Sequence, residues 1–163
     1  MTAEVDVPEA GANGVIIAQG GRFGGWSVYF HGGTAKFVYN VLGIHEFATE
    51  AEVPIPQGTH QVRMEFAYDG GGLAKGGAVR LFVDGNQVGA GRVEGTEPMV
   101  FSGDETADVG RDTGSAVSDD YRSEASVFNG TVSWVQIDID AAAEDLDHLI
   151  TPEERFRIAM ARQ

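Results

Sequence analysis

The chain has 163 residues, and its 25 acidic against 11 basic side chains give a net charge of −14. Hydrophobic residues make up 42% of the sequence, too many for a disordered acidic chain, and the 23 glycines follow no collagen-like period. This length suffices for one hydrophobic core, and the charge disfavours nucleic acid and membrane surfaces as partners. Because cysteine is absent, disulfides, thiol nucleophiles and thiolate metal sites are excluded.

Apolar and polar residues alternate between glycine-rich breaks along most of the chain, which is typical of half-buried antiparallel strands. Glycine-containing turns at residues 31–34 and 84–86 separate neighbouring strands, because such turns need residues that tolerate a positive φ. Roughly nine to twelve short runs of this kind predict a two-sheet antiparallel β-sandwich over residues 1–140. In chain order, the clearest of them are residues 2–8, 26–30, 36–41, 60–68, 78–83 and 87–93.

Residues 141–163 differ from the rest and are expected to form an acidic connection and a short C-terminal helix. Thr151 is a suitable N-cap, followed by proline at the first helical position and Glu154 at the third. Phe156 and Met160 fall on one stripe of this helix, whereas Ile158 lies on the far side. Two interpretations stay open: the helix packs on its own sandwich, or its second apolar side meets another domain or subunit.

Motifs for nucleophilic or phosphate chemistry are missing. No G-x-S-x-G is present, and the histidines lack the i, i+4 spacing of a zinc helix. The run at residues 70–77 places its lysine before the last glycines instead of in G-K-[ST], so we interpret it as a long hairpin. No signal peptide opens this chain and no stretch approaches the ~20 apolar residues that span a bilayer, so we expect a soluble protein.

Paired carboxylates on a strand face are a feature of β-sandwich glucanases. In residues 135–139, Val135, Ile137 and Ile139 are expected to point inward, which leaves Gln136, Asp138 and Asp140 on the other face. A glutamine occupies the place of the first carboxylate. We therefore favour a solvated strand face over a catalytic pair.

The most concentrated charge lies in residues 102–124, where seven acidic side chains stand against Arg111 and Arg122. Calcium takes six to eight oxygen ligands, and an acidic loop interrupted by glycines can supply them. Asp104, Asp108 and Asp112 are the candidate ligands, although the spacing is not that of an EF-hand. The alternative is a solvated loop with local arginine pairs.

Aromatic residues offer a second kind of binding site. Trp26, Tyr29 and Trp134 fall on predicted strands, and exposed rings on a concave sheet hold carbohydrate in lectin-like sandwiches. The alternative is that most of these rings belong to the core.

Two phrases resemble the hairpins of concanavalin-A-like and laminin-G-like jelly rolls: LFVDG at residues 81–85 and FNGTV at 128–132. Longer stretches are similar to the C-terminal domain of bacterial arylsulfatases, and the resemblance covers nearly the whole chain. These stretches are residues 14–30, 36–40, 62–85, 101–121 and 153–163.

The resemblance implies a concanavalin-A-like jelly roll that serves as a non-catalytic domain of a bacterial sulfuric ester hydrolase, present here as a fragment or a separately encoded piece. The parent enzyme would use a formylglycine, made from the motif C/S-x-P-x-R, and a divalent cation, commonly calcium. Neither this motif nor the family's metal ligands occur here, so no catalytic or cofactor residue carries over. The expected partner is a sulfatase catalytic domain or another copy of the chain, with Phe156, Ile158 and Met160 as candidate contacts. The alternative is a lectin-like carbohydrate-binding module.

Overall fold

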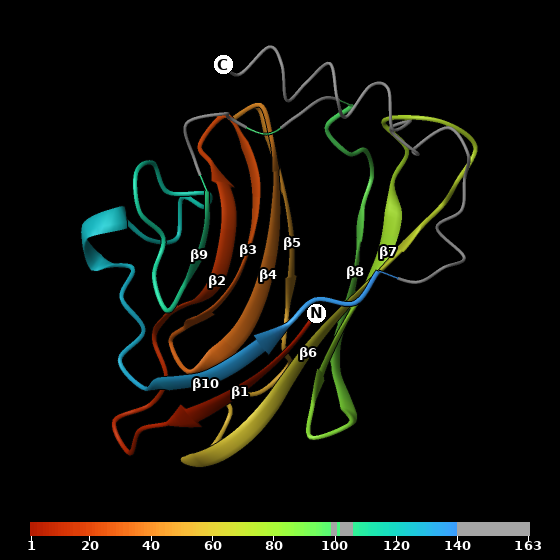
Figure 1. The fold of residues 1–163 in the computed structure, drawn as a ribbon. Coiled ribbons are helices and arrows are strands. Elements are labelled where there is room, and N and C mark those ends of the chain that lie inside the picture. Colours follow the sequence, from red (N-terminus) through yellow and green to blue (C-terminus); the bar gives the residue numbers. More distant parts are fainter. Residues whose placement is uncertain (99–100, 102–105, 140–163) are drawn as a thin grey trace.

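The structure, a computed structural model, describes residues 1–98, 101 and 106–139 (Figure 1). These residues contain ten strands and one short 3-10 helix. The elements are β1 (Thr2–Val7), β2 (Gly14–Gly21), β3 (Gly24–His31), β4 (Thr34–Val41), β5 (His45–Glu50), β6 (Gly58–Tyr68), β7 (Gly77–Val83), β8 (Asn86–Val93), β9 (Ala107–Val109), η1 (Ser123–Ala125) and β10 (Thr131–Gln136).

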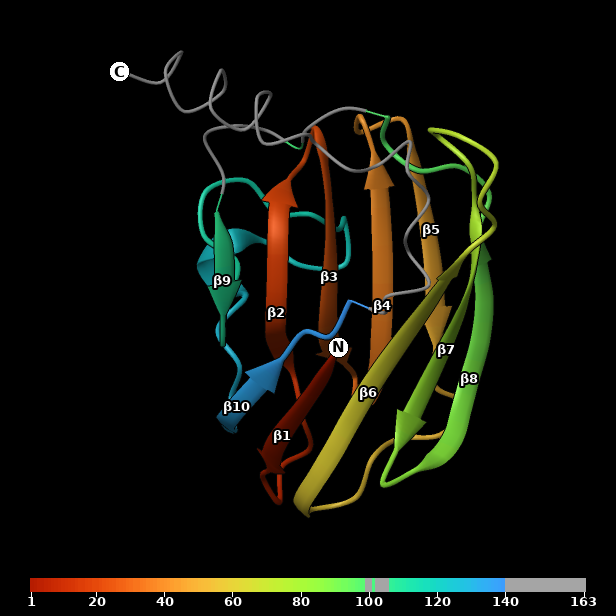
Figure 2. The ribbon, with the colours of Figure 1, turned by 45° about the vertical axis from the view of Figure 1, so that its right-hand side comes forward.

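The strands form two five-stranded antiparallel sheets that face each other (Figures 1 and 2). The order in one is β10-β1-β6-β7-β8, and in the other β5-β4-β3-β2-β9. We name them the β6 sheet and the β3 sheet after their central strands. The predicted two-sheet antiparallel sandwich is thus confirmed. The predicted acidic connection and C-terminal helix, residues 141–163, lie outside the described residues.

The expected turns are where the sequence places them. β3 and β4 are joined through the turn between His31 and Thr34, and β7 and β8 through Asp84 and Gly85, which both have positive φ. The glycine-rich run at 70–77 belongs to the hairpin in which Tyr68 pairs with Gly77. This arrangement agrees with its interpretation as a connection between strands.

One core fills the space between the sheets, built from alternate residues of each strand. The Phe30 ring of the β3 sheet stacks on Phe128, with the centroids 5.6 Å apart. The sandwich is closed along one side, where the amide of Glu52 donates to the carbonyl of Val88 at 2.8 Å. Gly89 permits this approach, since a Cβ there would lie 2.5 Å from the carbonyl oxygen of Glu50.

A second apolar cluster lies on the outer face of the β3 sheet. Residues 110–126, which we call the cover segment, run over this face beside β2 and β9 (Figure 1). Its Val117 is fully buried and packs with Val15, Tyr29 and Val38 of the sheet. No helix in the described part of the chain is long and apolar enough to cross a membrane.

Candidate functional site

The cover segment brings three buried polar residues, Asp112, Ser118 and Ser126, onto the β3 sheet. Its end is joined to β2 by the amide of Val15, which donates to the carbonyl of Ser126 at 2.8 Å. Gly14 makes this contact possible, because a Cβ there would lie 2.4 Å from the carbonyl oxygen of Val127. The segment is therefore held against the sheet by backbone contacts as well as by side chains.

Two tyrosines meet two carboxylates beneath the cover segment. Tyr29 donates to Asp120 at 2.5 Å, and Tyr121 donates to Asp112 at 2.6 Å. The two rings pack edge to face, with their centroids 5.1 Å apart. Burial, and then the neighbouring carboxylate, raises the pKa of each tyrosine. Both hydroxyls therefore remain protonated donors, and neither can act as a base near neutral pH.

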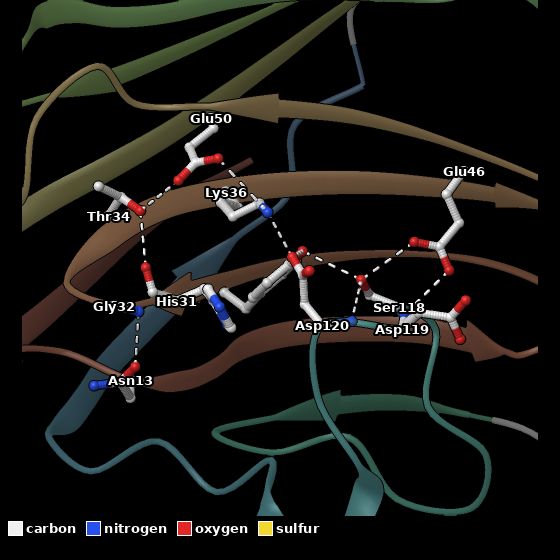
Figure 3. Close-up of polar contacts among 11 residues, drawn as sticks. Asn13, His31, Gly32, Thr34, Lys36, Glu46, Glu50, Ser118, Asp119 and Asp120 are labelled. Carbon is white, nitrogen blue, oxygen red and sulfur yellow. Dashed lines mark hydrogen bonds and ion pairs between the residues drawn. The ribbon is translucent and has the colours of Figure 1, made fainter.

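Lys36 of β4 lies at the edge of this cluster (Figure 3). Its ammonium is 2.5 Å from the carboxylate of Asp120 and 3.6 Å from that of Glu50. Burial by itself would lower the pKa of Lys36, but these carboxylates, Asp120 first, outweigh burial and raise it. For Asp120, burial is likewise outweighed by Lys36 and Tyr29, which lower its pKa. An ammonium held charged in this way is neither a nucleophile nor a general base.

Glu46 of β5 receives the neighbouring part of the cover segment. It accepts hydrogen bonds from the amide of Asp119 at 3.1 Å and from the hydroxyl of Ser118 at 3.3 Å (Figure 3). Burial, followed by the charge of Asp119, raises the pKa of Glu46, although its hydrogen bonds partly oppose this rise. The cluster contains more carboxylates than Lys36 can neutralise, and the raised pKa of Glu46 shows that its charged form is disfavoured in the folded protein.

At the other end of the cluster, the β3–β4 turn is fixed by hydrogen bonds of the same kind. The hydroxyl of Thr34 contacts the carboxylate of Glu50 at 2.7 Å and the carbonyl of His31 at 2.8 Å. The amide of Gly32 donates to the side chain of Asn13 at 2.8 Å. Thr34, Glu50 and Asn13 thus have hydrogen-bond partners within the protein.

The candidate calcium ligands have structural roles of their own. Asp104 lies outside the described residues. Asp108 accepts from the amide of Thr113 at 2.8 Å and from its hydroxyl, which lowers the pKa of Asp108. Asp112 is buried and accepts from the amide of Val117 at 3.0 Å. In the described ranges, no group of three or more acidic or histidine side chains is placed to hold a metal ion.

The cover segment is solvated only in part, because Asp119, Asp120 and Glu124 are exposed, whereas Asp112, Val117, Ser118 and Ser126 are all buried. Asp112 and Asp120 hold the segment on the sheet, because each accepts a hydrogen bond from a tyrosine and Asp112 also accepts one from a backbone amide. Calcium binding at Asp104, Asp108 and Asp112 stays a prediction.

The three candidate glycan-binding rings do not form one platform. Tyr29 is only 1% exposed beneath the cover segment, so its prediction as an exposed sugar-stacking ring is wrong. Trp26 packs against the core of the β3 sheet, and its indole donates to Gln19 at 3.0 Å. Trp134 lies on the β6 sheet opposite Glu4 and is 38% exposed. Of the three, Trp134 is the most exposed, and Trp26 is half-buried.

The possible carboxylate pair near the end of β10 is not brought together in the described residues. Gln136 donates to Asp138 at 2.7 Å, while Asp140 lies outside the described residues. Val135 faces the core as expected, but Ile137 and Ile139 are exposed, so their predicted inward orientation is wrong. The cause is that β10 ends at Gln136, where its partner β1 begins at Thr2.

Lys36, Glu46, Glu50 and Tyr121 were not singled out as site residues from the sequence. Lys36 and Asp120 are 84 residues apart, and no local pattern connects them. A usable signal was the apolar pair at residues 116–117 within the acidic run, since apolar residues in a polar loop indicate burial.

No protein-family model and no curated protein matches the chain.

Proposed function

We propose that the chain is a non-catalytic β-sandwich domain of an arylsulfatase-like sulfuric ester hydrolase, which stabilises or docks to the catalytic domain. The observation that carries this proposal is the use of the charged groups on the β3 sheet. Tyr29, Lys36, Asp112, Asp120 and Tyr121 bind one another or the backbone of the cover segment. A site that acts on a substrate needs such groups turned toward an open space.

The sequence resemblance to arylsulfatase C-terminal domains supplies the choice of parent enzyme. Residues 110–121 of the cover segment lie within one of the resembling stretches, residues 101–121. If the resemblance reflects common descent, the acidic run is retained because it closes this face of the sandwich. The formylglycine and the divalent cation would then belong to the catalytic domain and not to this chain.

Two measurements test the proposal. The purified chain, supplied with calcium, should not hydrolyse an aryl sulfate above the buffer rate. Mixed with a sulfatase catalytic domain that carries C/S-x-P-x-R, it should form a one-to-one complex in sedimentation velocity. Ile158→Ser should weaken the complex, whereas Val53→Ser, a change at an exposed residue of the sandwich, should not. Hydrolysis by the chain alone, or no complex at the highest soluble concentration, would contradict the proposal.

A lectin-like carbohydrate-binding module is the second candidate, and Trp134 is the observation that favours it. Its exposed ring lies on the outer face of the β6 sheet, where the paired residue Glu4 and its neighbour Gln61 can bind hydroxyl groups. A glycan screen of the wild type and of Trp134→Ala tests this candidate. Binding that the substitution removes would support it, and a screen without hits would exclude it.

A further inference from the structure

Three large apolar side chains are exposed together at one end of the β3 sheet. Phe23, in the β2–β3 connection, is 67% exposed, while Leu42 and Ile44, in the β4–β5 connection, are 50% and 70% exposed. The two connections touch, since a Cβ on Gly43 would lie 2.8 Å from the carbonyl oxygen of Arg22 and 3.8 Å from the Phe23 ring. We call Phe23, Leu42 and Ile44 the apolar tip.

Leu42 adopts a backbone conformation that leucine disfavours. Its φ is +55°, and the amide of Ile44 donates to the carbonyl of Val41 at 2.9 Å, which closes a tight hairpin turn. Such turns normally carry Asn, Asp or Gly at this position, as the β7–β8 turn does with Asp84. A strained and exposed leucine gives this turn no local advantage, so a contact outside the turn would explain it.

The sequence of residues 151–163 predicts an apolar stripe that would fit a surface of this kind. Their sequence predicts a helix with Phe156 and Met160 on one stripe. A helix of this length is marginal in isolation and depends on packing of its apolar stripe. The stripe and the apolar tip are similar in extent, because each presents two or three large side chains.

β10 points toward the end of the sandwich that carries the apolar tip. β10 runs in the same direction as β6, and Gln136 and Arg63 are level because both pair with Thr2. The β6–β7 connection, toward which both strands run, is at the same end of the sandwich as the apolar tip (Figures 1 and 2). From Arg63 to its end, β6 extends about 17 Å at 3.3 Å per residue. The residues at 140–150 can span up to about 36 Å when extended, which exceeds this length.

We propose that residues 151–163 dock on the apolar tip of the same chain as a helix, with Phe156 and Met160 against Phe23 and Ile44. The site is a hydrophobic contact between the C-terminal segment and two hairpin turns. Ile158, on the opposite side of the helix, stays available for a partner. The proposal concerns contacts within the chain, so it can succeed or fail independently of any sulfatase partner.

Limited proteolysis of the full chain tests the docking. Trypsin can cleave after Arg155 and Arg157, and mass spectrometry follows each cut. In the wild type, these cuts should be at least about tenfold slower than in a free peptide of residues 148–163, because docking must open first. In Phe23→Ser/Ile44→Ser the rates should approach those of the peptide.

Val53→Ser/Val127→Ser is the matched control, since it removes two equally exposed apolar side chains away from the tip. Its cuts should remain as slow as those of the wild type. Circular dichroism must show that both variants keep the sandwich. Cleavage of the wild type at the rate of the peptide, or unchanged protection in the tip variant, would overturn the proposal. Protection that disappears on dilution would also overturn it, because the helix would then dock on a second copy.

Discussion

Replacing Asp112 by alanine should destabilise the whole domain, because this buried carboxylate joins two parts of the cover segment. It accepts hydrogen bonds from the amide of Val117 at 3.0 Å and the hydroxyl of Tyr121 at 2.6 Å. Alanine leaves both donors without this acceptor at a site that is 1% exposed. Each hydrogen bond to a charged acceptor contributes about 1.5–3 kcal/mol. We therefore expect the free energy of unfolding to fall by about 3 to 5 kcal/mol.

Thermal unfolding followed by circular dichroism measures this loss. For a chain of this length, 1 kcal/mol corresponds to roughly 2–4 °C in Tm, so Asp112→Ala should lower Tm by about 6–20 °C. Asp119→Ala is the matched control, because that side chain is exposed and contacts Arg22 at 3.8 Å. It should change stability by less than about 0.5 kcal/mol.

A loss below about 0.5 kcal/mol for Asp112→Ala would refute the role assigned to the cover segment. The calcium hypothesis predicts a different pattern, in which the variant differs from the wild type in millimolar calcium but not in chelator. The hydrogen-bonding role predicts the same loss in both solutions. The two explanations are therefore separated by one pair of melting curves.

Three further changes test other parts of the structure. Acid should destabilise the domain below about pH 4, because the pKa of Asp120 is lower in the folded protein than in the unfolded chain. The stability that this carboxylate contributes is complete above its unfolded pKa and is lost as the pH falls. In Asp120→Asn, Tm should therefore vary less between pH 5 and 2. Glu46→Gln should raise Tm at pH 7, because a raised carboxyl pKa means that the charged form disfavours folding. An unchanged Tm would contradict this. Gly130→Ala should lower the free energy of unfolding, measured in urea, by more than about 2 kcal/mol, because its Cβ would lie 2.1 Å from the carbonyl oxygen of Asp6. Gly95→Ala, whose Cβ would make only ordinary contacts, should lower it less.

The sandwich could be predicted because the alternation of residues within a strand is local information. The alternation matches the inner faces of Trp26–Phe30 and of residues 62–64, and the glycine turns marked where the chain reverses. Ile137 and Ile139 continued the alternation but not the strand. The end of β10 is set by Thr2 on its partner, and a pattern within residues 131–139 contains no information about that partner.

The cover segment could not be predicted in the same way. Tyr29 lies on the outer face of its strand, but outer and exposed are not equivalent. Burial of Tyr29 depends on Val117 and Asp120, about ninety residues further along the chain. The acidic residues there were interpreted by their charge, whereas in the structure they act as hydrogen-bond acceptors for specific donors.

Hydrogen exchange at the amides of Asp112 and Val117 tests most directly whether the acidic run closes the β3 sheet. These amides donate to Ser126 and to Asp112, both within the buried part of the cover segment. They should exchange as slowly as the amides of the central strands β3 and β6, with calcium or with chelator alike. Exchange close to the rate of an unstructured peptide, or protection that requires calcium, would contradict this account of the acidic segment.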